Sequence, residues 1–231
     1  SEILDKYTDI ILVGDSLGSV LYSFDTTKKV NLKMMIEHSK SVRQGVKQSL
    51  MVVDMPYNTY RNKTEALKNA KKIIKYSKAD AIKLEGGKKI IEIIKHLRKN
   101  KINVMGHLGI LPQTHKGKFR YKGKTILERK NLFNDAVLLE KSGVFSIVLE
   151  CIETNLAKQI TKQLKIPTIG IGSSVNCDGQ VLVTDDLIGL NLTSIKFVKS
   201  FCKVRKHINL AVKKFIKEVK NKKYPSKKFS Y

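Results

Sequence analysis

The 231-residue sequence predicts an α/β protein, a (βα)8 TIM-type barrel that lacks its first strand in this chain and ends in an amphipathic helix. Seven short, β-branched hydrophobic runs alternate with segments of helical spacing, which favours a parallel sheet because parallel neighbours need crossover connections. Acidic side chains close several runs, and in such barrels chemistry gathers at the carboxyl ends of the strands. The length suits one such domain, so we expect residues 1–231 to form it, with 220–231 as a basic tail.

The expected strands are the hydrophobic runs at about 10–15, 50–54, 80–84, 103–107, 145–149, 167–171 and 180–183. Apolar residues three and four positions apart mark the helices between them: Leu32 to Val42, Ala66 to Ile74, Ile90 to Leu97, Leu132 to Leu139 and Leu156 to Leu164. Thr64, with Glu65 behind it, is the expected N-cap of the second helix. A long amphipathic stretch from about 194 to 220 closes the chain.

Seven strands leave an open sheet edge with unpaired backbone groups. We therefore expect a strand before Ser1, or another chain over the edge. A doubly wound open sheet is the alternative, but VGDSLG at 13–18 has neither the GxGxxG nor the GKS pattern that usually follows its first strand.

Composition limits the possible partners. The net charge of +25 suggests nucleic acid or an anionic membrane as a possible partner. However, only six of the 45 basic residues are Arg, the residue that specific phosphate and base recognition favours. No apolar run approaches the roughly 20 residues that cross a bilayer. Three scattered cysteines without a CxxC pair indicate a reducing compartment. We expect a soluble, cytoplasmic protein that binds neither nucleic acid nor membrane.

Four carboxylates stand where buried runs end: Asp15, Asp54, Glu85 and Glu150. A buried acid is costly unless it meets a cation, a donor or a ligand, so four at one barrel end suggest a shared divalent metal. Taken singly, each could instead cap a turn or pair with a surface Lys. Ser16 and His107 occupy similar positions.

Seven short motifs together resemble the ketopantoate hydroxymethyltransferase (3-methyl-2-oxobutanoate hydroxymethyltransferase) family. They are LVGDSLG at 12–18, DMPY at 54–57, IKLEGG at 82–87, GHLGILPQ at 106–113, LECI at 149–152, IPTIGIGS at 166–173 and CDGQVLV at 177–183. The resemblance covers almost the whole chain. It implies a Mg²⁺-dependent transferase of pantothenate biosynthesis that moves a one-carbon unit from 5,10-methylenetetrahydrofolate to 3-methyl-2-oxobutanoate, giving ketopantoate. It also implies a homo-oligomer, commonly a decamer.

The resemblance also assigns roles to residues. It implies that Asp15, Asp54 and Glu85 hold the metal, and that Glu150 is the catalytic base. The substrate-binding residues that it implies are Asp15, Ser16, Asp54, Lys83 and His107.

The chemistry of these residue types agrees with the resemblance. A hard dication prefers carboxylate oxygens, and it can chelate a 2-oxo acid and make its C3 hydrogen more acidic. Strand alternation puts Lys83 and Glu85 on one face, where Lys83 would bind the substrate carboxylate; a Schiff-base role is the alternative. His107 could also be an ordinary hydrogen-bonded core residue, although Gly106 and Gly109 permit close approach beside it.

The chain departs from the family pattern in three places. The family's first strand has no counterpart, since the chain begins in what resembles the tail of the first helix. The loop after the IPTIGI run has Ser174 where the family has Gly, which could restrict backbone approach to a ligand. The segment 114–124 has Lys118 in place of a second Gly, and keeps Phe119 and Arg120; it could be a mobile lid or an ordinary surface loop.

Two rival functions remain open at this point. A 2-oxo-acid carbon–carbon lyase of the isocitrate lyase and phosphonomutase type would share the fold and the metal chemistry. Those enzymes usually carry a reactive KKCGH-type motif, which this sequence does not contain. A basic nucleic-acid-binding protein is the alternative from a different class, and salt-dependent binding would reveal it.

Overall fold

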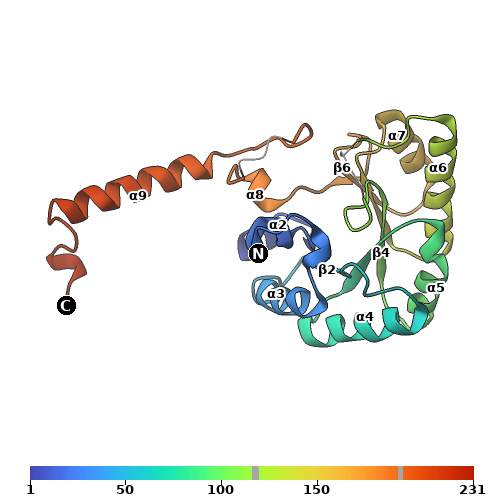
Figure 1. Ribbon diagram of the computed structural model, residues 1–231, viewed down its shortest axis with the longest axis horizontal. Coiled ribbons are helices and arrows are strands. Elements are labelled where there is room, and N and C mark those ends of the chain that lie inside the picture. Colours follow the sequence, from blue (N-terminus) through green and yellow to red (C-terminus); the bar gives the residue numbers. More distant parts are fainter. Residues whose placement is uncertain (116–119, 192–194) are drawn as a thin grey trace. The chain divides into compact units, whose positions relative to one another are not determined.

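The computed structural model describes residues 1–115, 120–191 and 195–231 (Figure 1). The chain divides into two compact units, Ser1–Val181 and Leu182–Tyr231. The first holds the sheet and its helices, and the second holds the C-terminal helix. That residues 1–231 form one domain stays a prediction.

The first unit is built on a sheet of seven parallel strands in sequential order from β1 to β7. The strands are β1 (Ile10–Val13), β2 (Leu50–Asp54), β3 (Ala81–Glu85), β4 (Val104–Gly109), β5 (Ser146–Glu150), β6 (Thr168–Ile171) and β7 (Gly179–Gln180). The sheet curls, and the helices that join the strands run along its outer side (Figure 1). This confirms the predicted barrel-type α/β fold, and within the described residues no strand precedes β1.

Strands β1 and β7 are the two ends of this sheet in the described ranges. The last strand is shorter than the expected run at 180–183. Gly179 and Gln180 pair with β6, and the ladder ends where Val181 N donates to Gly170 O at 3.0 Å. Hydrophobicity alone did not show where this pairing stops.

Five helices form the outer layer of the first unit. They are α3 (Leu32–Gln44), α4 (Lys63–Ser77), α5 (Ile91–Lys99), α6 (Ile126–Lys141) and α7 (Thr154–Gln163). Each corresponds to one of the predicted helical segments, although Ile90 lies just before α5 and Leu164 just after α7. The expected cap of α4 was wrong: Asn62, not Thr64, is the N-cap, and its side chain accepts a hydrogen bond from Glu65 N. Glu65 does lie in the first turn, as predicted.

Several short elements had no counterpart in the hydrophobic pattern. They are α1 (Glu2–Asp5), α2 (Leu17–Tyr22), α8 (Thr184–Leu187) and the 3-10 turns η1 (Thr27–Lys29), η2 (Lys88–Ile90) and η3 (Lys227–Phe229). The C-terminal helix α9 (Val204–Lys220) confirms the predicted amphipathic helix but begins later than expected, because 195–203 are not helical. No helix in the described part of the chain is long and apolar enough to cross a membrane.

Two hydrophobic clusters follow from the alternation of side chains along the strands. The larger cluster lies between the sheet and its helices and includes Met51 and Val53. The smaller one lies on the other, inner face and consists of Val52, Ala81, Met105 and Val148, with partly buried neighbours. Because strand side chains alternate, the residue two positions after each of these four points to the same inner face. Those residues are Asp54, Lys83, His107 and Glu150.

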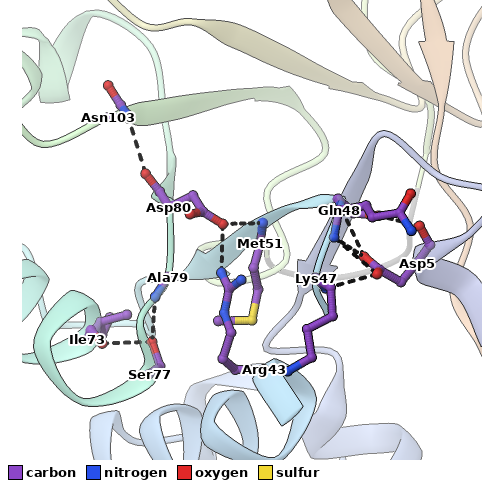
Figure 2. Close-up of polar contacts among 11 residues, drawn as sticks. Asp5, Arg43, Lys47, Gln48, Met51, Ile73, Ser77, Ala79, Asp80 and Asn103 are labelled. Carbon is purple, nitrogen blue, oxygen red and sulfur yellow. Dashed lines mark hydrogen bonds and ion pairs between the residues drawn. The ribbon is translucent and has the colours of Figure 1, made fainter. Parts of the chain in front are cut away.

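Polar anchors hold the opposite, amino-terminal ends of the strands (Figure 2). The Asp5 carboxylate accepts hydrogen bonds from the backbone N–H groups of Lys47, Gln48 and Ser49 at 2.8 to 3.1 Å. Asp80 accepts hydrogen bonds from Met51 N at 2.8 Å and from Arg43 at 2.6 Å. These contacts tie α1 and α3 to the starts of β2 and β3. They thereby help to fix the position of the strands whose other ends carry the site.

Candidate active site

Polar side chains from five neighbouring strand ends meet on the inner face of the sheet. The strand register places Asp54 beside Lys83 and Glu85 beside His107, and Gly109 beside Glu150. Asp15 lies two residues beyond the end of β1. All of these polar side chains are buried except that of Glu150, which is 17% exposed. Of these side chains, that of Glu150 is therefore the most accessible from outside.

Asp15, Asp54 and Lys83 form one end of this group. Lys83 Nζ lies 2.6 Å from Asp54 Oδ1, and Asp54 Oδ2 accepts a hydrogen bond from Asp15 N at 3.0 Å. Burial, followed by the negative charge of Asp54, raises the pKa of Asp15 to about 7 despite the nearby Lys83. Burial disfavours the charge of Lys83, but Asp54, Glu85 and Asp15 outweigh it and raise its pKa. Lys83 is therefore a charged partner of the carboxylates.

His107 joins the two acids at the other end. Its Nδ1 lies 3.5 Å from Glu85 Oε1, and its Nε2 lies 3.1 Å from Glu150 Oε2. These are ion-pair contacts that lack hydrogen-bond geometry. Burial and Lys83 act to lower the pKa of His107, but the two carboxylates outweigh them and raise it to about 9. A protonated imidazole thus lies between Glu85 and Glu150.

Gln113 connects the two ends. Its side-chain Nε2 donates to Asp15 Oδ2 at 2.8 Å and to Met55 O at 2.9 Å, while its backbone N donates to Glu85 Oε2 at 3.1 Å. The Tyr60 hydroxyl donates to Gln113 Oε1 at 2.5 Å. Burial, followed by the charge of Glu85, raises the pKa of Tyr60, so the phenol stays a donor. The polar group is therefore continuous from Asp15 to Glu150.

The pair Asp15 and Asp54 fits a hard divalent cation, whose preferred ligands are carboxylate oxygens. Asp54 Oδ1 has no hydrogen bond within the described residues and is balanced by the ion pair with Lys83. The pKa of Asp15 is raised first by burial and then by the negative charge of Asp54, and a bound cation would offset both. In ranges 1–115, 120–191 and 195–231, no three His, Cys, Asp or Glu side chains are grouped to hold a metal. Glu85 as a third ligand stays a prediction.

The structure brings six of the seven candidate residues into one network. Ser16 is the exception: it is half-buried, is the N-cap of α2, and its side chain forms no hydrogen bond with the other six, all of which the structure describes. Gln113 and Tyr60 were missed as site residues, although Gln113 closes the quoted GHLGILPQ motif. The two glycines near His107, Gly106 and Gly109, allow close packing within the protein itself. A Cβ on Gly106 would meet Leu139, and one on Gly109, at φ +103°, would overlap Glu150 O.

The other two departures from the family pattern have different outcomes. Ser174 is buried, its hydroxyl accepts from Asn176 N at 3.2 Å, and its carbonyl accepts from Gln180 Nε2 at 2.8 Å. Its φ is not positive, so the position does not demand glycine. In the segment 114–124, Lys118 and Phe119 lie outside the described residues, and the choice between a lid and a surface loop stays a prediction.

Comparison with known families matches residues 1–227 to the model of ketopantoate hydroxymethyltransferase. The chain belongs to this family. A 3-methyl-2-oxobutanoate hydroxymethyltransferase of Pelagibacter ubique is 67% identical over 231 residues, covering 100% of this chain and 90% of the relative. The enzyme of the same name from Acetivibrio thermocellus is 44% identical, over 100% of this chain and 83% of the relative.

Solved structures support the fold of this hydroxymethyltransferase family member. The structure of 2,3-dimethylmalate lyase, a PEP mutase/isocitrate lyase superfamily member, matches with a TM-score of 0.58 and 10% identity. The match covers 99% of this chain and 78% of the lyase. At such low identity the likeness concerns architecture alone. The lyase-type alternative therefore has the likeness of the fold and nothing more, whereas the sequence comparisons assign the hydroxymethyltransferase family.

Proposed function

We propose that this protein transfers a hydroxymethyl group from 5,10-methylenetetrahydrofolate to 3-methyl-2-oxobutanoate, giving ketopantoate for pantothenate synthesis. The observation that carries the proposal is the buried network that joins Asp15 and Asp54 to Glu150 through Gln113, Glu85 and His107. It combines an oxygen-rich cation site with a carboxylate that can accept a proton, as an enolising enzyme requires.

Asp15 and Asp54 would hold Mg²⁺, with Glu85 completing the site from the far side of Gln113. When bound, the ion would chelate the carboxylate and keto oxygens of the substrate and draw electron density from the carbonyl. Lys83, whose charge is fixed by Asp54 at 2.6 Å, would attract the substrate carboxylate, and Ser16 would offer its hydroxyl nearby. This charged state argues against the Schiff-base alternative, which needs a neutral amine.

Glu150 would act as the base. Its side chain is the most exposed of the network and lies 3.1 Å from His107 Nε2, so the imidazolium can orient the carboxylate and hold the charge balance as the proton moves. The N10–methylene bond of the folate would break to leave a methylene iminium on N5. Water adds to that carbon, so that formaldehyde leaves and the two water protons end on N5 and N10 of tetrahydrofolate. Glu150 takes the C3 proton, C3 forms a bond to the formaldehyde carbon as its C=O π bond opens, and the resulting alkoxide takes up a proton to become the hydroxyl group.

Location and assembly are part of the proposal. The three cysteines, Cys151, Cys177 and Cys202, are all free, which supports the predicted cytoplasmic location. We also propose that the chain associates with copies of itself into a homo-oligomer, which the family resemblance predicts to be a decamer. The expectation that nucleic acid and membranes are not partners also stays a prediction.

The test is exchange of the C3 proton of 3-methyl-2-oxobutanoate with solvent deuterium, followed by NMR without folate. We expect exchange in the wild type that depends on Mg²⁺, and a loss of at least about 100-fold in Glu150→Gln, which is typical for removal of a general base. Glu92→Gln, which changes an exposed acid on α5, is the matched control and should exchange normally.

Each outcome of this test has a separate meaning. Exchange that persists in Glu150→Gln would remove Glu150 as the base and leave the cation site standing. Wild-type exchange that ignores Mg²⁺ and chelators would contradict the metal assignment. Absence of any exchange in the wild type, with folate-dependent transfer also absent, would overturn the proposed function.

A further inference from the structure

A hollow of about 1000 Å³ opens beside the polar network. Tyr60 and Glu85 line it and also belong to the network, so its occupant would lie next to the reacting substrate. Ligand sites commonly measure about 300–1000 Å³, and this hollow lies at the upper end of that range. It is far larger than a small branched oxo acid needs. The space is suited to a second, larger reactant.

The lining of the hollow combines aromatic, amide and cationic groups. Tyr57 presents a half-buried ring, with Lys28 Nζ 5.5 Å from its centroid, and a flat ring could stack there. Asn131 and Asn134 of α6 supply amide donors and acceptors. Lys88 and Lys89 line the hollow and are exposed, and neither forms an ion pair with another residue of the described ranges, so their charges can meet an anion.

The glycine turn before these lysines is fitted closely to α6. Gly86 has a φ of +133°, and a Cβ on Gly87 would overlap the Asp135 carboxylate. Asp135 Oδ1 accepts a hydrogen bond from Lys88 N at 3.0 Å, which fixes the start of the turn that carries both lysines. Asp135 also lines a second hollow of about 480 Å³, so the available space continues along α6.

We propose that this hollow binds the reduced folate, with Lys88 and Lys89 pairing with the carboxylates of its glutamate tail. A reduced folate consists of a polar bicyclic ring, an aromatic linker and an anionic tail, which matches the amide, tyrosine and lysine groups of the lining in kind. The inference rests on the proposed function, because that function supplies the folate as co-substrate. It adds the residues that recognise the folate tail.

The test is calorimetric titration of the full chain with 5-formyltetrahydrofolate, in the presence of Mg²⁺ and 3-methyl-2-oxobutanoate. We expect the double variant Lys88→Ala/Lys89→Ala to raise the Kd about tenfold, since two partly exposed charge pairs contribute together about 1.4 kcal/mol. 5-Formyltetrahydropteroate, which lacks the glutamate, should bind wild type and variant equally. The double variant Lys71→Ala/Lys72→Ala removes the same charge from exposed positions on α4 and should leave the Kd unchanged.

The deuterium-exchange half-reaction separates failure of this inference from failure of the function. An equal Kd in wild type and the Lys88/Lys89 variant, with exchange intact, would overturn the tail site alone. A loss that affects folate and pteroate alike would also overturn it, because the lysines would then not act on the tail. Wild-type exchange without any 5-formyltetrahydrofolate binding would refute the hollow as the folate site.

Discussion

At the scale of single residues, Gln113 shows how one uncharged residue contacts two acids of the site. Its amide donates to Asp15 and to Met55 O, its backbone donates to Glu85, and its oxygen accepts from Tyr60. An acidic residue here would add negative charge beside Asp15, whose pKa is already raised by burial and then by the charge of Asp54. Gln113 donates to one carboxylate through its side chain and to the other through its backbone, and it adds no charge, so it suits a site that must also accommodate a cation.

Replacing Gln113 should therefore be costly. In Gln113→Leu, Asp15, Met55 O and Tyr60 lose their partner inside a buried site, and each unsatisfied buried group costs about 1–3 kcal/mol. We expect a decrease of roughly 3 kcal/mol in the free energy of unfolding by urea denaturation, together with weaker Mg²⁺ binding measured by calorimetry.

The control is Gln159→Leu, an exposed change on α7 that should stay within about 0.5 kcal/mol of the wild type. A Gln113→Leu protein with wild-type stability and wild-type Mg²⁺ affinity would mean that the bridging role is wrong.

Sequence reasoning found the charged residues of the site but not the neutral ones. Asp54, His107 and Glu150 could be placed because they stand at the ends of hydrophobic runs. Lys83 could be placed because strand side chains alternate and it lies two residues before Glu85. Gln113 and Tyr60 lie in connections after strands, where no periodic pattern gives their direction. Their importance depends on distances across the sheet, such as the 2.5 Å between Tyr60 Oη and Gln113 Oε1, which spacing along one chain does not contain.

At the scale of elements, the strands could be predicted more closely than the helix ends. A buried parallel strand is a compact hydrophobic run, and all seven runs correspond to strands of the sheet. The start of α4 is set by one side-chain hydrogen bond from Glu65 N to Asn62, and several polar residues nearby could have served. The start of α9 is likewise later than its amphipathic pattern, which continues through a non-helical segment.

The attachment of α1 leads to a prediction of pH dependence. Backbone N–H donation, chiefly from Ser49, and then from Lys47 and Gln48, outweighs desolvation and lowers the pKa of Asp5 to about 2, below its ordinary value of 3.8 (Figure 2). A carboxyl with a lowered folded-state pKa stabilises the fold above its unfolded pKa and loses that contribution as pH falls toward the folded value. Asp5→Asn should therefore be less stable than the wild type at pH 7, and the gap should narrow between about pH 4 and pH 2.

Urea unfolding of both proteins across that pH range measures the gap. Asp9→Asn, a change of an exposed neighbouring acid, is the control. A gap between wild type and Asp5→Asn that widened on acidification would contradict the assignment, because the sign of the linkage would be reversed.

At the scale of the whole molecule, the site depends on the sheet as a unit. Its side chains come from the ends of β2 to β5 and from the residues after β1, so no single βα unit contains it. The net charge of +25 does not come from the site. The site itself is rich in carboxylates, and a basic surface around an acidic centre would favour the approach of anionic reactants such as an oxo acid and a folate.

The exposed face of α9 carries the prediction for assembly. Within the unit Leu182–Tyr231, apolar side chains repeat at helical spacing and are each 45 to 54% exposed: Ile208, Val212, Phe215, Ile216 and Val219. Monomers rarely leave such a continuous apolar face uncovered, and the expected homo-oligomer supplies its occupant, a second copy of the chain. Val212→Glu/Ile216→Glu places two charges on this face and should shift the sedimenting mass toward the 26.2 kDa of a single chain.

Lys213→Glu/Lys217→Glu is the control: it changes the same helix at lysine positions and should leave the oligomer intact. A wild-type protein that sediments at 26.2 kDa would show that α9 does not join copies, as would a double Glu variant of unchanged mass.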